Sequence, residues 1–224
     1  MLTVCANSKG GVGKSTIAVH LATWIFDQGY RVGLLDTDKQ RSSSQWLAEV
    51  EPSIAIRVAD TPEECVIAAQ ELTQSCDFVV GDAPGGLEDL SRTLLILANR
   101  VIFPISPSIL DVRSVSQATA VLRYAQGINS GRPEGVLVLN KMRTRDTISQ
   151  ELRDDAPKLG LRVAGNLIRD LQAFRDAAQQ GTVVTRFGRK GAQAAADIDA
   201  LFTELVGSDL KVLFNERRQK VGNG

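Results

Sequence analysis

A glycine-rich loop near the start of the chain constrains its fold more than any other feature. The loop reads NSKGGVGKST over residues 7–16 and follows MLTVCA, an apolar stretch rich in strand-forming residues. After the loop, apolar residues from Ile17 to Phe26 recur at helical spacing. A strand, a glycine turn and a helix in this order predict a phosphate-binding loop.

The residues of this loop are expected to bind the phosphates of a nucleotide. Its glycines allow a tight turn, so that backbone N–H groups converge on an anion at the positive end of the helix dipole. We expect Lys14 to reach the terminal phosphates and the Ser15 hydroxyl to bind Mg²⁺. The predicted nucleotide-binding residues of the loop are Gly10, Gly11, Val12, Gly13, Lys14, Ser15 and Thr16. The alternative is a glycine-rich turn that binds no ligand.

The loop departs at one end from the usual phosphate-loop pattern. Ser8 stands where that pattern has its first glycine, and Lys9 adds a second lysine beside it. A lysine inside an anion-binding loop points to a role with phosphates, although a plain surface lysine is the alternative.

Apolar stretches that alternate with helical patterns predict an α/β fold. Further strands are expected at 31–36, 54–59, 77–82, 100–105, 135–140 and 161–168, and helices at 62–75, 88–98, 109–127, 145–158 and 190–206. Strands that are apolar throughout are buried on both faces, which indicates a mostly parallel, twisted sheet with helices on both sides. We therefore expect a P-loop NTPase fold.

Size and composition favour one domain. A chain of 224 residues with 43% hydrophobic content can bury one large core. The predicted domain covers 1–207, and 208–224 is expected to be a short, disordered tail after a last helical turn. Cys5, Cys65 and Cys76 lack metal-type spacing and are expected to be reduced thiols in the core. With no visible secretion signal or membrane-length apolar run, we expect a soluble, cytoplasmic protein.

Carboxylates follow two of the predicted strands. Asp36 and Asp38 come after the second strand, and Asp82 follows the apolar stretch FVVG. Ligands of parallel sheets bind beyond the carboxyl ends of the strands, so these acids should lie near the phosphate loop. We expect Asp82 to order the water shell of Mg²⁺, with Asp36 as a further metal candidate. An ordinary loop carboxylate or helix cap is the alternative for each.

Three segments together carry a family resemblance. KGGVGKST, DTDKQ and VVGDAPGG resemble the deviant Walker A ATPases of the ParA/MinD superfamily. The resemblance implies ATP and Mg²⁺ as cofactors and an ATP-dependent homodimer in which Lys9 reaches the partner's phosphates. It also implies that Asp38 orients the attacking water and that Asn140, in VLNK, contacts the base. For Asn140, a simple turn residue is the alternative.

Two departures from the family pattern affect the loops around the site. Lys39 stands where the family usually has proline, and Gly85 replaces one residue of a proline pair. Proline fixes φ and glycine frees it, so both loops are expected to be more mobile than in the family.

The expected partners also follow from the resemblance. ParA-like members bind DNA non-specifically, and MinD-like members bind membranes through a C-terminal helix. With 26 basic and 26 acidic residues, only a local patch can attract DNA, and the cluster Arg186, Arg189 and Lys190 is the candidate. An ordinary solvated surface is the alternative for this cluster. The apolar part of the tail is barely one turn long, which disfavours the membrane.

We therefore expect a ParA-like, nucleoid-associated ATPase that partitions or positions a cargo. The cargo could be a plasmid, a chromosome region or a protein assembly such as a carboxysome, as in the McdA branch. A ParB-like or cargo-adaptor protein is expected to stimulate hydrolysis. A metabolic enzyme of the same fold, such as an iron protein or a biotin-pathway ligase, is an alternative. An iron protein would need cysteines at strand ends.

Overall fold

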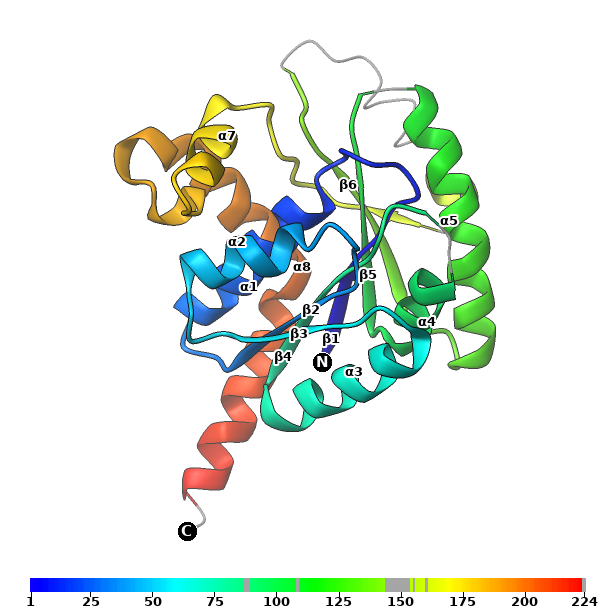
Figure 1. Cartoon of the computed structure of the whole chain (residues 1–224), viewed down its shortest axis with the longest axis horizontal. Helices are drawn as coiled ribbons and strands as arrows, with labels where there is room; N and C mark the ends of the chain where they lie inside the picture. The colour runs from blue at the N-terminus through cyan, green and yellow to red at the C-terminus, as the bar shows by residue number, and fades with distance from the viewer. Residues whose placement is uncertain (87–88, 108, 144–153, 155, 160, 223–224) are drawn as a thin grey trace.

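The computed structural model describes the chain except residues 87–88, 108, 144–153, 155, 160 and 223–224. One seven-stranded sheet, with all neighbouring strands parallel, organises the described residues in the order β3-β2-β4-β1-β5-β6-β7 (Figure 1). The strands are β1 Leu2–Cys5, β2 Val32–Asp36, β3 Ala55–Val58, β4 Phe78–Asp82, β5 Arg100–Ile105, β6 Glu134–Leu139 and β7 Arg162–Val163. The predicted parallel α/β fold is therefore confirmed.

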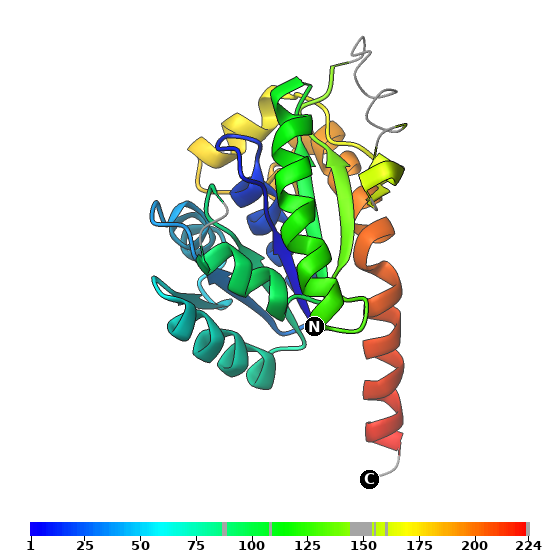
Figure 2. The ribbon, with the colours of Figure 1, turned by 90° about the vertical axis from the view of Figure 1, so that its right-hand side faces the viewer.

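Helices cover both faces of the sheet (Figures 1 and 2). They are α1 Lys14–Asp27, α2 Ser42–Val50, α3 Pro62–Ser75, α4 Asp89–Leu97, α5 Ile109–Ile128, α7 Gln172–Gln179 and α8 Gly188–Gly222, with short 3₁₀ helices at Ala156–Leu159 and Val184–Arg186. One apolar core lies between the sheet and α1, α2, α7 and α8, and a second lies between the sheet and α3, α4 and α5. Strand residues alternate between the two cores, which explains why the strands are apolar throughout.

One predicted strand is shorter in the structure than expected. The strand expected at 161–168 is only Arg162–Val163, because the N–H groups of Gly165 and Asn166 donate to the Glu204 carboxylate on α8. The helix expected at 145–158 falls almost wholly outside the described residues. Helices α2 and α7 were not expected, since each buries few apolar side chains.

The last helix is longer than the pattern at 190–206 indicated. Helix α8 continues through the segment expected as a tail, to Gly222, and its end extends beyond the rest of the fold (Figure 2). Leu210 remains buried there, and the Tyr30 hydroxyl donates to its carbonyl at 2.7 Å. In the described part of the chain, no helix combines the length and apolar character needed to cross a membrane.

Candidate nucleotide-binding site

The predicted phosphate loop joins β1 to α1 at the carboxyl edge of the sheet. Gly11 and Gly13 have positive φ angles of 76° and 99°, a region that other residues avoid. Gly13 caps α1, so the N-terminus of this helix faces the space enclosed by the loop. The local geometry therefore suits an anion.

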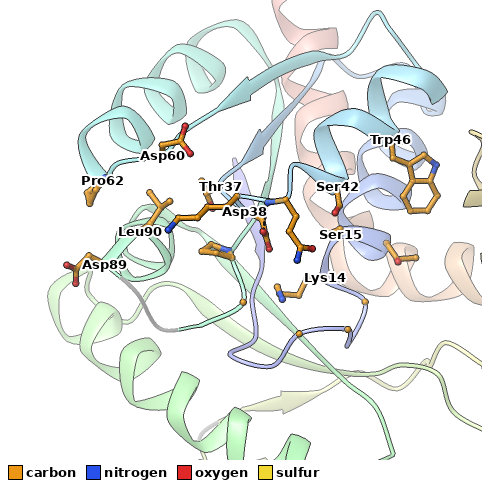
Figure 3. A pocket seen from close by; sticks show the side chains of 18 of the residues that line it. Lys14, Ser15, Thr37, Asp38, Ser42, Trp46, Asp60, Pro62, Asp89 and Leu90 are labelled. Carbon is orange, nitrogen blue, oxygen red and sulfur yellow. Dashed lines mark hydrogen bonds between the residues drawn. The ribbon is translucent and has the colours of Figure 1, made fainter.

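A cavity of about 880 Å³ opens in front of the loop (Figure 3). Its walls come from the phosphate loop, the segments after β2 and β3, and the segment between β4 and α4. Lys14, Ser15 and Asp38 surround one part of it, and Asp60 and Asp89 lie on the opposite side. All but one of the loop residues predicted to bind nucleotide line this cavity. The exception is Val12, whose side chain is buried.

The two lysines of the loop have different environments. Lys14 is 6% exposed, and its ammonium group donates to the carbonyl oxygen of Lys9 at 3.4 Å. The backbone N–H of Lys9 donates to Asn7 Oδ1, which fixes the start of the loop, and Lys9 itself is partly exposed. Lys14 is thus directed into the loop, while Lys9 lies at its rim.

Asp82 ends β4 behind the phosphate loop and is completely buried. Burial, together with the nearby negative charge of Asp36, raises the pKa of its carboxyl group to about 7. The hydroxyls of Ser15 and Ser43 lie close enough to oppose this shift, but neither Asp82 oxygen has a hydrogen-bond partner of good geometry. A buried carboxylate without partners fits a hydrated Mg²⁺ ion as its counterpart.

Asp36 and Asp38 have distinct positions although only Thr37 lies between them. Asp36 is fully buried, and its two oxygens accept the N–H groups of Asp38 and Ser44. Asp36 therefore caps α2 and shapes the loop after β2. Asp38 is partly exposed on the cavity wall, where its Oδ1 accepts the N–H of Gln40 at 2.9 Å.

Asn140 and Lys141 directly follow β6 and contact the phosphate loop, and Lys141 also lines the large cavity. The Asn140 side chain is 4% exposed and donates to the Val12 carbonyl at 2.7 Å. Lys141 donates from Nζ to the Gly11 carbonyl at 2.6 Å. Asn140 also lines a smaller cavity of about 210 Å³, which α7 borders. Sequence reasoning had missed Lys141, although its place after a central strand was an available signal.

Arg41 is a second residue that sequence reasoning missed. Its guanidinium donates to the Asp36 carbonyl at 2.8 Å and forms an ion pair with Asp60. The backbone of Arg41 has a positive φ angle of 53°, which is uncommon outside glycine. The backbone N–H of Arg41 donates to the Asp38 carbonyl. Arg41 thereby ties the loop that carries Asp38 to the end of β3. Nothing in the local sequence pattern distinguishes it from an ordinary surface arginine.

His20 is a buried packing residue on α1. Burial lowers its pKa to about 4, so the ring is neutral. Nε2 accepts the Val184 N–H at 3.2 Å, which leaves Nδ1 to donate to the Thr16 carbonyl at 2.8 Å. Trp46 and Phe174 contact the ring edgewise. His20 joins the start of α1 to the segment that leads into α8.

The three basic residues predicted to contact DNA are in different situations. Arg186 pairs with Asp27 and Glu51, at 2.6 and 3.0 Å. Arg189 and Lys190 are exposed in the first turn of α8. Neither side chain forms a hydrogen bond or ion pair with any residue that the structure describes.

The three cysteines are buried and unpaired, as expected. Cys5 lies within β1, Cys65 within α3 and Cys76 directly after it. Among the described residues, no cluster of three or more His, Cys, Asp or Glu side chains is arranged to hold a metal ion.

Comparison with known proteins bears on the same segments. The profile of the CobQ/CobB/MinD/ParA nucleotide-binding domain matches residues 3–202. The maintenance of carboxysome distribution protein A of Halothiobacillus neapolitanus is 29% identical over 210 residues, or 91% of this chain and 95% of that protein. The septum site-determining protein MinD of Bacillus subtilis is 26% identical over 176 residues, covering 62% of this chain and 64% of its own length.

Solved structures show the same fold. A Cyanothece McdA variant in complex with ATP superposes with a TM-score of 0.73 at 17% identity, covering 92% of this chain and 96% of the other. The cell division protein MinD of Aquifex aeolicus superposes with a TM-score of 0.70 at 18% identity, covering 92% and 96%.

Proposed function

The chain belongs to the CobQ/CobB/MinD/ParA nucleotide-binding family, and we propose that it is a Mg²⁺-dependent ATPase that positions a cargo. In this proposal, ATP joins two copies into a dimer, the dimer binds DNA non-specifically, and hydrolysis releases it. An adaptor protein stimulates hydrolysis, and the protein works on the nucleoid in the cytoplasm. The carboxysome-distribution relative supports a protein assembly as one class of cargo.

The observation that carries the proposal is the phosphate loop with Lys14 inside it, Lys9 at its rim and the unpartnered Asp82 behind it. Lys14 and the loop N–H groups would neutralise phosphate charge. Asp82 would hold the water shell of a Mg²⁺ ion that Ser15 contacts, and the ion would screen the charge that develops on the phosphates.

The remaining residues would act on the nucleophile and on the partner subunit. Asp38, on the cavity wall, would orient a water molecule toward the terminal phosphate. Lys9 would contact the phosphates held by the other subunit, which makes ATP part of the dimer interface. Asn140 would lie beside the base, at the border of the smaller cavity.

DNA binding measured with ATP, with ADP and without nucleotide tests this function. The proposal expects tight binding only with ATP and Mg²⁺, and none for Lys14→Ala, because no other group replaces the ammonium charge inside the loop. Binding of both proteins under all three conditions would contradict it. ATP affinity of Lys14→Ala equal to that of the wild type would overturn the site itself.

A second candidate is a membrane-bound positioning ATPase. The observation that favours it is the extension of α8 past the core, where Val212 and Phe214 are 57% and 52% exposed. Sedimentation with anionic liposomes in the presence of ATP tests this candidate. Three results together would support it over the first: the wild type sediments with the liposomes, a chain truncated after Gly207 does not, and the wild type does not bind DNA.

A further inference from the structure

We propose that Asn140 and Lys141 are positioning residues that hold the phosphate loop in its anion-binding conformation before any ligand arrives. The inference rests on the proposed nucleotide-binding function. It concerns a different step, because it explains how the loop acquires its shape rather than what the loop binds.

The two side chains contact successive carbonyl groups of the loop. Asn140 Nδ2 lies 2.7 Å from the Val12 oxygen, and Lys141 Nζ lies 2.6 Å from the Gly11 oxygen. A third carbonyl, that of Lys9, accepts Lys14 Nζ at 3.4 Å. Two of these three hydrogen bonds come from the residues directly after β6. This strand is far from the loop in sequence but close to it in the sheet.

Fixing these carbonyls also fixes the N–H groups that the loop offers to phosphate. In a planar trans peptide, the C=O and N–H bonds point in opposite directions. Holding the Gly11 and Val12 oxygens toward β6 therefore turns the N–H groups of Val12 and Gly13 away from it. Within the residues that the structure describes, these two N–H groups donate to no protein atom, as an anion cradle requires.

The backbone on both sides is adapted to this contact. A Cβ atom at Gly13 would overlap the Asn140 amide, so glycine is needed here for the approach as well as for its φ of +99°. Lys141 has a φ of +57°, which is uncommon outside glycine. The Asn140 oxygen accepts the N–H of Lys141 at 2.9 Å and stabilises that turn. The end of β6 is thus shaped so that both side chains meet the loop.

The test compares Lys141→Met with Lys39→Met and Lys141→Arg. Lys141 and Lys39 are both exposed lysines on the wall of the large cavity, but only Lys141 contacts the loop in the structure. Lys39→Met therefore removes the same charge without removing the restraint. Lys141 is exposed, so its variants should fold, which a melting curve checks.

Two measurements are made on each protein. NMR order parameters of the Val12 and Gly13 N–H groups in the ligand-free protein should fall from about 0.85 to below about 0.6 in Lys141→Met, stay unchanged in Lys39→Met and return in Lys141→Arg. ADP affinity should fall about tenfold in Lys141→Met and less than threefold in Lys39→Met, since a charge-assisted hydrogen bond is lost only in the first.

The two measurements separate the inference from the proposed function. Unchanged order parameters of Val12 and Gly13 in Lys141→Met would overturn the positioning role, whatever happens to ADP binding. Equal losses of affinity in the two methionine variants would also overturn it, because charge alone would then explain them. A wild-type protein that fails to bind ADP would contradict the proposed function, while the order parameters of the loop would still decide the inference.

Discussion

Asp36 and Asp82 lie opposite each other in the register of β2 and β4, both fully buried, yet their carboxylates have opposite environments. Both oxygens of Asp36 accept backbone N–H groups, from Asp38 and Ser44. Both oxygens of Asp82 lack a hydrogen-bond partner. Asp36 thus builds the loop that carries Asp38, whereas Asp82 is the carboxylate that remains for a cation.

The first prediction concerns the stability cost of this arrangement. The pKa of Asp82 is raised by burial to about 7, so between about pH 4 and pH 7 the folded protein keeps a proton that the unfolded chain has lost. The free energy of unfolding should therefore fall as the pH rises through this window. Asp82→Asn cannot ionise, and at pH 8 it should be more stable than the wild type by up to about 4 kcal/mol.

Urea unfolding of both proteins at pH 4 and pH 8 measures this difference. The two proteins should be similar at pH 4, where Asp82 is protonated in the fold. Parallel pH profiles would show that Asp82 does not ionise in this window. The same substitution should weaken Mg²⁺-dependent nucleotide binding, although it stabilises the fold. Asp82→Asn should lose most of the increase in ADP affinity that Mg²⁺ gives the wild type.

The second prediction concerns Lys9. Lys9→Ala leaves the backbone carbonyl that accepts Lys14 in place, so the variant should bind ATP with an affinity within about threefold of the wild type. It should remain a monomer with ATP and Mg²⁺, because the proposed contact with the partner's phosphates is gone. Light scattering with ATP measures the mass, and Lys211→Ala, on the distant end of α8, serves as the control for loss of a lysine.

A Lys9→Ala protein that still dimerises with ATP would contradict the role across the interface. If the variant lost both ATP binding and dimerisation, Lys9 would instead act in the nucleotide site of its own subunit. Lys9→Arg should keep the dimer, since it retains the charge at the rim of the loop.

The sequence carried the central features of the site because each depends on local pattern. Glycines at 10, 11 and 13, followed by Lys14, predict the loop, and apolar strands ending in Asp36 and Asp82 predict which carboxylates meet it. The contacts of Lys141 and Arg41 could not be read in this way. Each depends on a backbone with positive φ and on partners from other strands, which only the assembled sheet brings close.

The errors in the predicted secondary structure also occur where distant contacts, rather than the local sequence pattern, decide the structure. Helix α2 was not expected, since its sequence SSSQWLAEV has few buried apolar residues, and its start depends on the distant Asp36 carboxylate. The strand at 161–168 was overestimated because the adjacent N–H groups of Gly165 and Asn166 both donate to Glu204 on α8, whereas in a strand they would point in opposite directions. Tertiary partners decide both cases.

The third prediction concerns Asp38. Its carboxylate lies on the cavity wall and accepts only a local N–H in the contacts that the structure gives, so Asp38→Ala should leave the phosphate loop intact. ATP hydrolysis should fall at least about a hundredfold, while ATP affinity changes less than about threefold. The ATP dimer should accumulate, because assembly no longer ends in hydrolysis.

Phosphate release and light scattering measure the two effects of Asp38→Ala. Asp89→Ala is the matched control, since it removes an exposed carboxylate from the other side of the same cavity and should keep most of the turnover. Turnover in Asp38→Ala equal to that of Asp89→Ala would move the water-orienting role to another group.

The fourth prediction concerns the DNA surface. The ion pairs of Arg186 with Asp27 and Glu51 leave Arg189 and Lys190 as the two free cations of the predicted cluster, within the described part of the chain. A dimer then offers four cations at equivalent places. Each phosphate contact contributes about 0.9 to the slope of log affinity against log salt, so the slope should be about −3.6.

The double variant Arg189→Ala/Lys190→Ala tests that count. It should bind every DNA sequence more weakly and with a slope near zero, because contacts with phosphates carry no sequence information. ATPase activity without DNA should be kept, since both residues lie on the surface in the first turn of α8. Lys211→Ala, at the other end of the same helix, should retain the wild-type slope. If that single variant flattened the slope and the double variant did not, the DNA surface would lie at the end of α8, and the start of the helix would be an ordinary solvated surface.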